Sequence, residues 1–167
     1  MLGIAINDSG KLVTTTKTFT IDQALSKVNS LKDKLTQRNT HVEVFKYCTK
    51  ELVANNYFHA VFESCKGVAC RLRDFTGLNK DGAELVDMIF SLSNPIVKIN
   101  GLISESEKSE HKGFANLLKG IFGMIRNPLA HDPKLNWNMN EQDALDIFAM
   151  LSMIHRKIDI MVLIPKN

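Results

Sequence analysis

Apolar residues recur at steps of three and four along most of this chain, the repeat that places side chains on one face of an α-helix. The longest such run follows Asn140 and begins with Glu141 and Asp143, which favour the positive end of a helix dipole. Its apolar stripe consists of Ala144, Ile147, Leu151, Ile154, Ile158 and Met161, widened by Leu145 and Phe148. We expect a helix with so broad a stripe to be central to a bundle or shared with a partner chain.

The same repeat predicts four more helical regions. They cover residues 22–38, 41–72, 83–92 and 104–125, and Asn55-Asn56 is a plausible break or cap inside the second. Ser104 and the acidic residues after it resemble a helix start. The sequence therefore predicts an all-α fold, a helical bundle of about five helices.

Residues 1–20 have a different pattern. Short β-prone segments flank the turn residues 7–10, and a Thr-rich run follows. This pattern suggests a short β-hairpin, with a partly ordered extended arm as an equal alternative. We therefore divide the chain into an N-terminal arm or hairpin over 1–20 and a helical domain over 21–167.

Composition limits the class of protein. The 167 residues fit one domain, and a net charge of +3 is compatible with RNA as a partner without arguing for it. Cys48, Cys65 and Cys70 stand at no metal-ligand spacing and predict small buried residues of a reduced compartment. The apolar stretch 2–6 is too short for a signal peptide, and no apolar run approaches the roughly 20 residues of a membrane span. We expect a cytoplasmic protein with no membrane contact.

One segment suggests chemistry: Arg126-Asn127-Pro128-Leu129-Ala130-His131. Attack of an RNA 2′-hydroxyl on the neighbouring phosphate needs a base that works near neutral pH, and histidine suits that range. A guanidinium stabilises the charge that builds on the phosphate oxygens, and Asn127 could donate to the phosphate or orient His131. This chemistry needs no metal or other cofactor.

The spacing alone is weak evidence, because such a gap between arginine and histidine is common by chance. In an unbroken helix two residues five apart point roughly 140° apart, so Arg126 and His131 would diverge. Pro128 permits a kink that turns both toward one cleft, and a cleft between two chains is the alternative. Arg126 could instead bind the last carbonyls of its helix, and Asn127-Pro128 could simply start the next one.

The order of elements, the segment 125–131 and the long apolar last helix resemble the HEPN superfamily. Residues 56–63, 109–111 and 141–145 resemble, more narrowly, a prokaryotic Abi-like (abortive infection) branch of it. The resemblance implies a helical bundle, frequent dimers, and metal-independent RNases of phage defence and toxin systems, although some members do not cleave RNA. Arg126, Asn127 and His131 match the arginine, polar residue and histidine of the superfamily motif.

For other polar residues the evidence of a functional role is weaker. Glu63 and Lys66 could support the site, although a surface pair three residues apart on a helix is favoured. Glu107 and His111 have the spacing of a metal pair but lack a third ligand, so a solvated face is the favoured interpretation.

The sequence thus predicts a HEPN-type endoribonuclease, a hydrolase that cleaves RNA at a composite site of a homodimer. Cleavage needs a base and an acid, and two chains would supply two histidines. An antitoxin or another defence-system protein is a possible further partner. The alternative is a non-catalytic helical module that dimerises or binds a nucleotide, RNA or protein.

Overall fold

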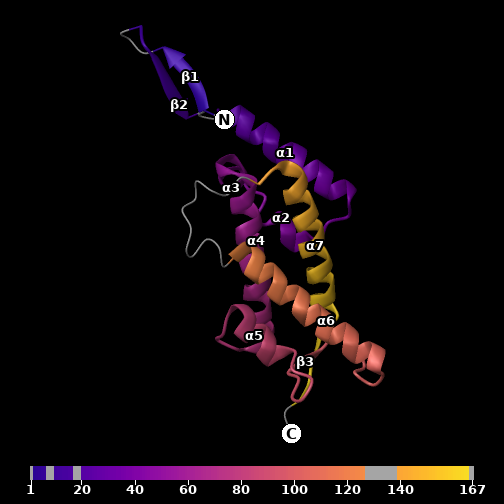
Figure 1. The fold of residues 1–167 in the computed structure, drawn as a ribbon. Helices are drawn as coiled ribbons and strands as arrows, with labels where there is room; N and C mark the ends of the chain where they lie inside the picture. Colours follow the sequence, from indigo (N-terminus) through magenta and orange to yellow (C-terminus); the bar gives the residue numbers. More distant parts are fainter. Residues whose placement is uncertain (1, 7–9, 17–19, 127–138, 166–167) are drawn as a thin grey trace.

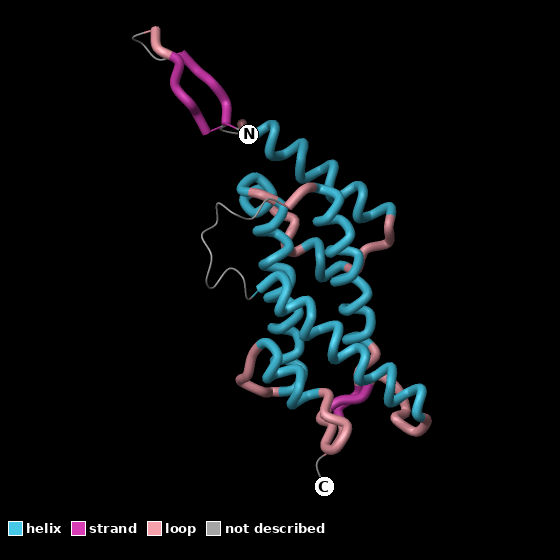
Figure 2. Tube along the Cα trace, viewed as in Figure 1, coloured by secondary structure: helices cyan, strands magenta, loops and turns pink. Residues whose placement is uncertain are grey.

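The computed structural model describes residues 2–6, 10–16, 20–126 and 139–165, and it confirms the all-α fold (Figures 1 and 2). The helices are α1 (Ile21–Gln37), α2 (Val42–Phe45), α3 (Lys50–Asn55), α4 (Tyr57–Thr76), α5 (Gly82–Ile89), α6 (Glu105–Ile121), the π-helical turn η1 (Phe122–Arg126) and α7 (Glu141–Asp159). The described chain thus has more α-helices than the five expected. The 41–72 region accounts for the difference, because it divides into α2, α3 and α4.

Local sequence explains where the helices begin and end. Thr20 and Ser104 each form a capping box with the residue three positions later, so the hydroxyl and the returning side chain satisfy free backbone N–H groups at the starts of α1 and α6. Asn56 starts α4, because its side-chain oxygen accepts from the His59 backbone N–H at 2.7 Å. Gly77 ends α4 with a φ of 70°, a left-handed conformation that glycine adopts without strain.

The centre of the bundle is the pair α4 and α7, which pack along each other (Figure 1). The apolar stripe predicted for α7 is buried throughout, from Ala144 to Ile158, and Met161 beyond its end is buried as well. α1 and α2 lie on one side of α7, and α6 with η1 closes the other side of the core. Of the two alternatives expected for this helix, the structure shows the first, a position central to the bundle.

Two small antiparallel strand pairs accompany the helices, and only the first is a hairpin. β1 (Leu2–Ile6) pairs antiparallel with β2 (Leu12–Thr16), which confirms the N-terminal hairpin. This hairpin lies beyond the start of α1, away from the helical body (Figure 2). β3 (Val97–Lys98) pairs antiparallel with β4 (Val162–Leu163) and ties the end of the chain to the segment before α6.

Two predictions about burial are wrong. Cys48 and Cys65 are buried, but Cys70 is exposed, since it lies on the outer face of α4 with its thiol directed at Asp74. His111 was expected on a solvated face, yet it is fully buried and its ring lies 5.2 Å from the ring of Phe90. His111 therefore belongs to the apolar face of α6, although the residues on either side of it are polar.

Candidate functional site

The predicted motif begins where η1 ends. Apolar residues anchor α6 and η1 in the core up to Ile125, which is buried, and Arg126 is the last residue of η1. A π-helical turn widens the helix by one residue, and such turns are frequent at functional sites. The turn therefore shifts the backbone of Arg126 out of the 3.6-residue repeat of α6. The side chain of Arg126 and the residues Asn127 and His131 lie outside the described residues.

An apolar groove of about 380 Å³ lies beside the end of η1. It is lined by Phe58, Met124, Ile125, Met139, Asp143, Asp146 and Ile147. Ile125 precedes the motif, and Met139 is the first described residue after it. The segment that carries Arg126, Asn127 and His131 therefore leaves and re-enters the described structure at this groove.

The groove walls are apolar except for two carboxylates. Asp143 accepts a hydrogen bond from the Asn140 side chain at 2.8 Å, and Asp146 accepts from Gln142 at 3.0 Å. Arg38 approaches Asp146 at 3.5 Å as an exposed ion pair. Both acids thus have partners in the chain, but their charge opposes a phosphate placed in the groove itself.

Glu63 and Lys66 form an ion pair on α4, with Lys66 Nζ 3.0 Å from Glu63 Oε1. The surface pair expected from their spacing is therefore present. Lys66 also lies over the ring of Phe62, with Nζ 5.3 Å from the ring centre. The half-buried His59 lies one turn earlier, its ring stacked on the same Phe62 at 6.5 Å. These contacts give the pair a complete local explanation, independent of any role beside Arg126.

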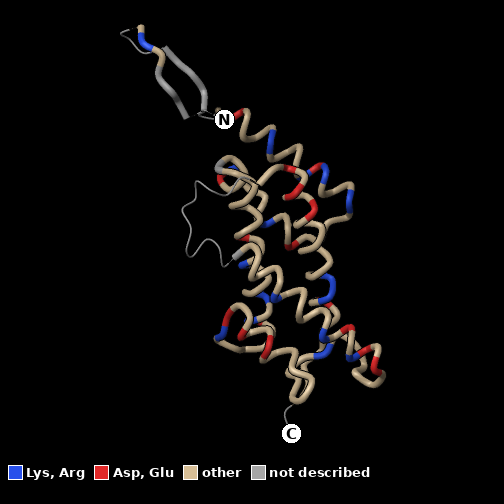
Figure 3. Tube along the Cα trace, in the orientation of Figure 1, with Lys and Arg blue, Asp and Glu red and all other residues tan. Residues whose placement is uncertain are grey.

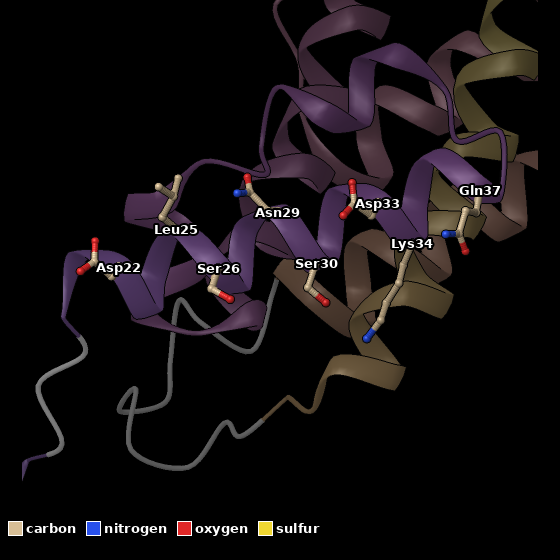
Figure 4. A pocket seen from close by; sticks show the side chains of 8 residues that line it. All are labelled: Asp22, Leu25, Ser26, Asn29, Ser30, Asp33, Lys34 and Gln37. Carbon is tan, nitrogen blue, oxygen red and sulfur yellow. The ribbon is translucent and has the colours of Figure 1, made fainter.

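A second hollow lies along the polar face of α1 (Figure 4). Its lining includes Ser26, Ser30 and Asp33, and Figure 4 shows their side chains standing along the one helix. Lys34, also in this hollow, has its ammonium 2.8 Å from Glu141 at the start of α7. Among the described residues, one solvated helix face supplies the lining, so the groups that this hollow brings together all come from α1.

The structure reveals one polar cluster that the sequence did not indicate. Arg71 on α4 bonds Asp159 at the end of α7, with Nη2 2.6 Å from Oδ1. Its other nitrogen, Nη1, lies 3.1 Å from His155 Nδ1. His41, the residue before α2, places Nε2 2.8 Å from the second Asp159 oxygen and stacks its ring on His155 at 5.3 Å. These four residues, His41, Arg71, His155 and Asp159, are called the polar cluster below.

The hydrogen bonds of the polar cluster leave little capacity for acid–base chemistry. His41 Nδ1 accepts from the Glu43 backbone N–H at 3.2 Å and so caps α2, while Nε2 is directed at Asp159. Because a guanidinium only donates, His155 Nδ1 accepts from Arg71 and the proton of this ring is on Nε2. That Nε2 is buried and has no partner among the described residues. The cluster therefore fixes α2 to α4 and α7, a structural role.

Burial and charge set the protonation of the polar cluster. Burial, the charge of Arg71 and the nearby His41 ring lower the pKa of His155 to about 4, so the His155 ring is neutral at pH 7. Burial alone would raise the pKa of Asp159, but the hydrogen bonds from Arg71 and His41 outweigh it and lower that pKa. Asp159 is therefore ionised under ordinary conditions.

Basic and acidic residues alternate over the helices (Figure 3). Several lysines are paired, such as Lys119 with Asp87 at 2.7 Å and Lys108 with Glu105 at 2.8 Å. Within the described ranges no set of three His, Cys, Asp or Glu side chains is placed to hold a metal ion. In that same part of the chain, no helix has the length and apolar character that a bilayer crossing requires.

Residues 38–158 match a family described as a protein of unknown function (Hypoth_ymh), and this match covers more than half of the chain. The chain belongs to this family. The Hypoth_ymh region runs from the end of α1 to the last turn of α7, so it includes Arg126, Asn127 and His131 as well as most of the polar cluster. The N-terminal hairpin precedes it. No curated protein and no solved structure matches the chain.

Proposed function

We propose that this protein is a metal-independent endoribonuclease of the HEPN type that acts in phage defence or as a toxin. His131 serves as the base that takes the proton of the RNA 2′-hydroxyl, and Arg126 stabilises the charge on the phosphate. Asn127 donates to a phosphate oxygen or orients His131. The products are a 2′,3′-cyclic phosphate and a 5′-hydroxyl.

One observation carries this proposal: the buried α6–η1 helix ends at Arg126, and the chain re-enters the structure at the same groove through Met139. A rigid helix end is a suitable base for a catalytic segment, because the scaffold limits where the segment can go. The π-helical turn before Arg126 supports the same interpretation.

The unit of function in this proposal is a homodimer. Cleavage needs a general base and a general acid, and one chain offers a single histidine in the motif. Two copies related by a two-fold axis bring two Arg126 and two His131 side chains to one cleft. An antitoxin or another defence protein is a further partner under this proposal, and we place the protein in the cytoplasm.

The test is incubation of pure protein with RNA in EDTA, beside His131→Ala and Arg126→Ala. We expect the wild type to cleave and both variants to lose most of the activity. Mass spectrometry of the fragments should show cyclic phosphate ends. Equal cleavage by all three proteins would sink the assignment, since a contaminating nuclease would then explain it.

The alternative proposal is a non-catalytic helical module that dimerises or binds a nucleotide, RNA or protein. The carboxylates of Asp143 and Asp146 in the groove favour it, because they repel a phosphate backbone. In that case Arg126 caps its helix and His131 is structural. An inactive wild type together with unfolding of His131→Ala would support this alternative.

A further inference from the structure

We infer that the outer face of α7 pairs with the same face of a second copy of this chain, with the two helices antiparallel. The face consists of Gln142, Asp146, Ala149, Met153, Arg156 and Ile160 and is called the α7 face below. Its members follow one another at alternating steps of four and three residues, so they form one stripe along the whole helix.

Among the described residues, α7 has neighbours on both sides of this stripe, and Arg38 reaches onto it at Asp146. On one side Lys34 of α1 bonds Glu141, and the backbone N–H of His41 before α2 donates to Ser152 at 2.8 Å. On the other side Lys157 pairs with Glu110 of α6. Between these contacts Met153 is 38% exposed and Ile160 is 56% exposed. In the part of the chain that the structure describes, the neighbours of α7 therefore leave a partly apolar strip exposed between them.

The order of residues on the α7 face makes it complementary to itself. Reversing the helix about the level of Leu151 brings Asp146 level with Arg156 of a second copy, and Arg156 level with its Asp146. The same reversal sets the small Ala149 opposite Met153. The pairing thus contains two Asp146–Arg156 pairs and two Ala149–Met153 pairs. Such repeated pairs are typical of an isologous two-fold interface.

The two charges of the α7 face are weakly engaged within their own chain. Arg156 donates to the Ser152 hydroxyl at 2.7 Å and makes no ion pair with any described residue. Asp146 accepts a hydrogen bond from Gln142 at 3.0 Å and meets Arg38 at 3.5 Å, and its side chain is 62% exposed. An exposed pair at this distance contributes little, so Asp146 remains able to meet a second basic group.

This pairing also deepens the proposed function, and its relation to cleavage rests on that function. A two-fold axis perpendicular to the plane of two antiparallel helices keeps the same flank of each on the same side of the dimer. The η1 flank, where Met124, Asp146 and Ile147 line the groove, is therefore on one side of the dimer for both copies. Ile147 lies four residues from Leu151, the centre of the antiparallel pairing, which is about 6 Å along the helix. The two grooves, one on each copy, are therefore offset along the helices by about 12 Å.

The test is the mass of the full-length protein by sedimentation equilibrium across a concentration series. We expect the wild type at twice the chain mass of 18.8 kDa. Met153→Glu should weaken the dimer about 100-fold, because it buries a charge opposite an alanine. The matched control is Met88→Glu on α5, since Met88 is 39% exposed and Met153 38%, and it should remain dimeric.

Charge reversal tests the antiparallel register. Asp146→Arg and Arg156→Asp should each weaken the dimer, because each sets like charges level, and the double variant should recover it. Circular dichroism confirms that each variant is folded. A monomeric wild type, a Met153→Glu variant as dimeric as the control, or a double variant as weak as the single ones would each overturn the inference.

The two proposals can fail separately. A wild type that is dimeric through the α7 face but does not cleave RNA rejects the nuclease and keeps the interface. A wild type that cleaves RNA as a monomer rejects the interface and keeps the nuclease. Loss of both the dimer and cleavage in Met153→Glu, with cleavage intact in Met88→Glu, supports both.

Discussion

The chain contains two arginine–histidine pairs that differ in their spacing along the sequence. Arg126 and His131 are five residues apart in the sequence and belong to a segment at the end of η1. Arg71 and His155 are far apart in the sequence, yet the guanidinium and imidazole nitrogens lie 3.1 Å apart. The first pair was singled out by its spacing, and the second by contact in the structure.

Residue type alone does not decide the role of a histidine. In the polar cluster the nitrogens of His41 are used by Asp159 and a helix cap, and His155 is buried. Such a group holds helices together and has no open position for a substrate. A catalytic histidine needs the reverse, a ring nitrogen that reaches the reacting group. The two pairs should therefore respond in opposite ways to the same substitution.

The largest effect is expected from Arg126→Met, which removes the guanidinium and keeps an apolar stem. Loss of one group that stabilises transition-state charge reduces turnover by about 100- to 1000-fold. RNA cleavage in EDTA measures this effect. The urea midpoint should stay close to that of the wild type. A variant that keeps its activity but unfolds more easily would assign Arg126 to structure and remove the contrast with Arg71.

Arg71→Met is the matched substitution in the other pair. It leaves Asp159 and His155 without their shared donor, and loss of hydrogen bonds to a charged group costs about 2–3 kcal/mol of unfolding free energy. Urea denaturation measures this loss. Cleavage per folded molecule should be unchanged. A folded Arg71→Met protein with wild-type stability and no activity would reverse the roles of the two pairs.

The next effect in size is a loss of stability at mildly acidic pH. The pKa of His155 is about 4 in the folded chain, below the 6.5 of a free histidine, so the unfolded chain binds its proton first. Stability is therefore full above about pH 6.5 and falls as the pH drops toward 4. Burial lowers the pKa of His111 as well, which adds to the same trend.

Urea midpoints between pH 7 and pH 5 report mainly on the histidines, since carboxylates titrate mainly below that range. Across it we expect a loss of about 1–2 kcal/mol from His155 in the wild type. His155→Gln cannot take up the proton and should show a shallower dependence. An identical slope in both proteins would show that His155 does not contribute to the acid sensitivity.

Sequence patterns were sufficient for the long helices and the N-terminal hairpin, but not for the division into α2 and α3 or for the pairing of β3 with β4. The α7 stripe, the Ser104 start of α6 and the break near Asn56 all follow from local rules of periodicity and capping. The polar cluster does not, because His41 and Asp159 meet only after α2 has packed on α7. Likewise, the backbone at Gly67 approaches the ring of Tyr47 so closely that a side chain there would clash. No local sequence pattern predicts this approach.

The candidate site, too, could be predicted only in part from the sequence. The sequence located Arg126 at a helix end, which the structure confirms, but it gave no sign of the groove formed by Phe58, Met124 and Ile147. These residues lie on three elements, and their meeting depends on tertiary packing. The polar residues next to His111 in the sequence predict an exposed side chain. Its burial depends on a tertiary contact with Phe90, which the local pattern does not indicate.

The smallest effect is expected from the Glu63–Lys66 pair, which belongs neither to the predicted motif nor to the polar cluster. Its ion pair is partly exposed, and such pairs contribute up to about 0.5 kcal/mol, so Glu63→Gln and Lys66→Gln should barely change the urea midpoint. If the pair only covers Phe62, cleavage is unchanged as well. Glu43→Gln is the matched control, because Glu43 forms the equivalent i,i+3 pair with Lys46 on α2, 2.7 Å apart. Reduced cleavage in Glu63→Gln but not in Glu43→Gln, at equal stability, would give Glu63 a supporting role at the Arg126 site.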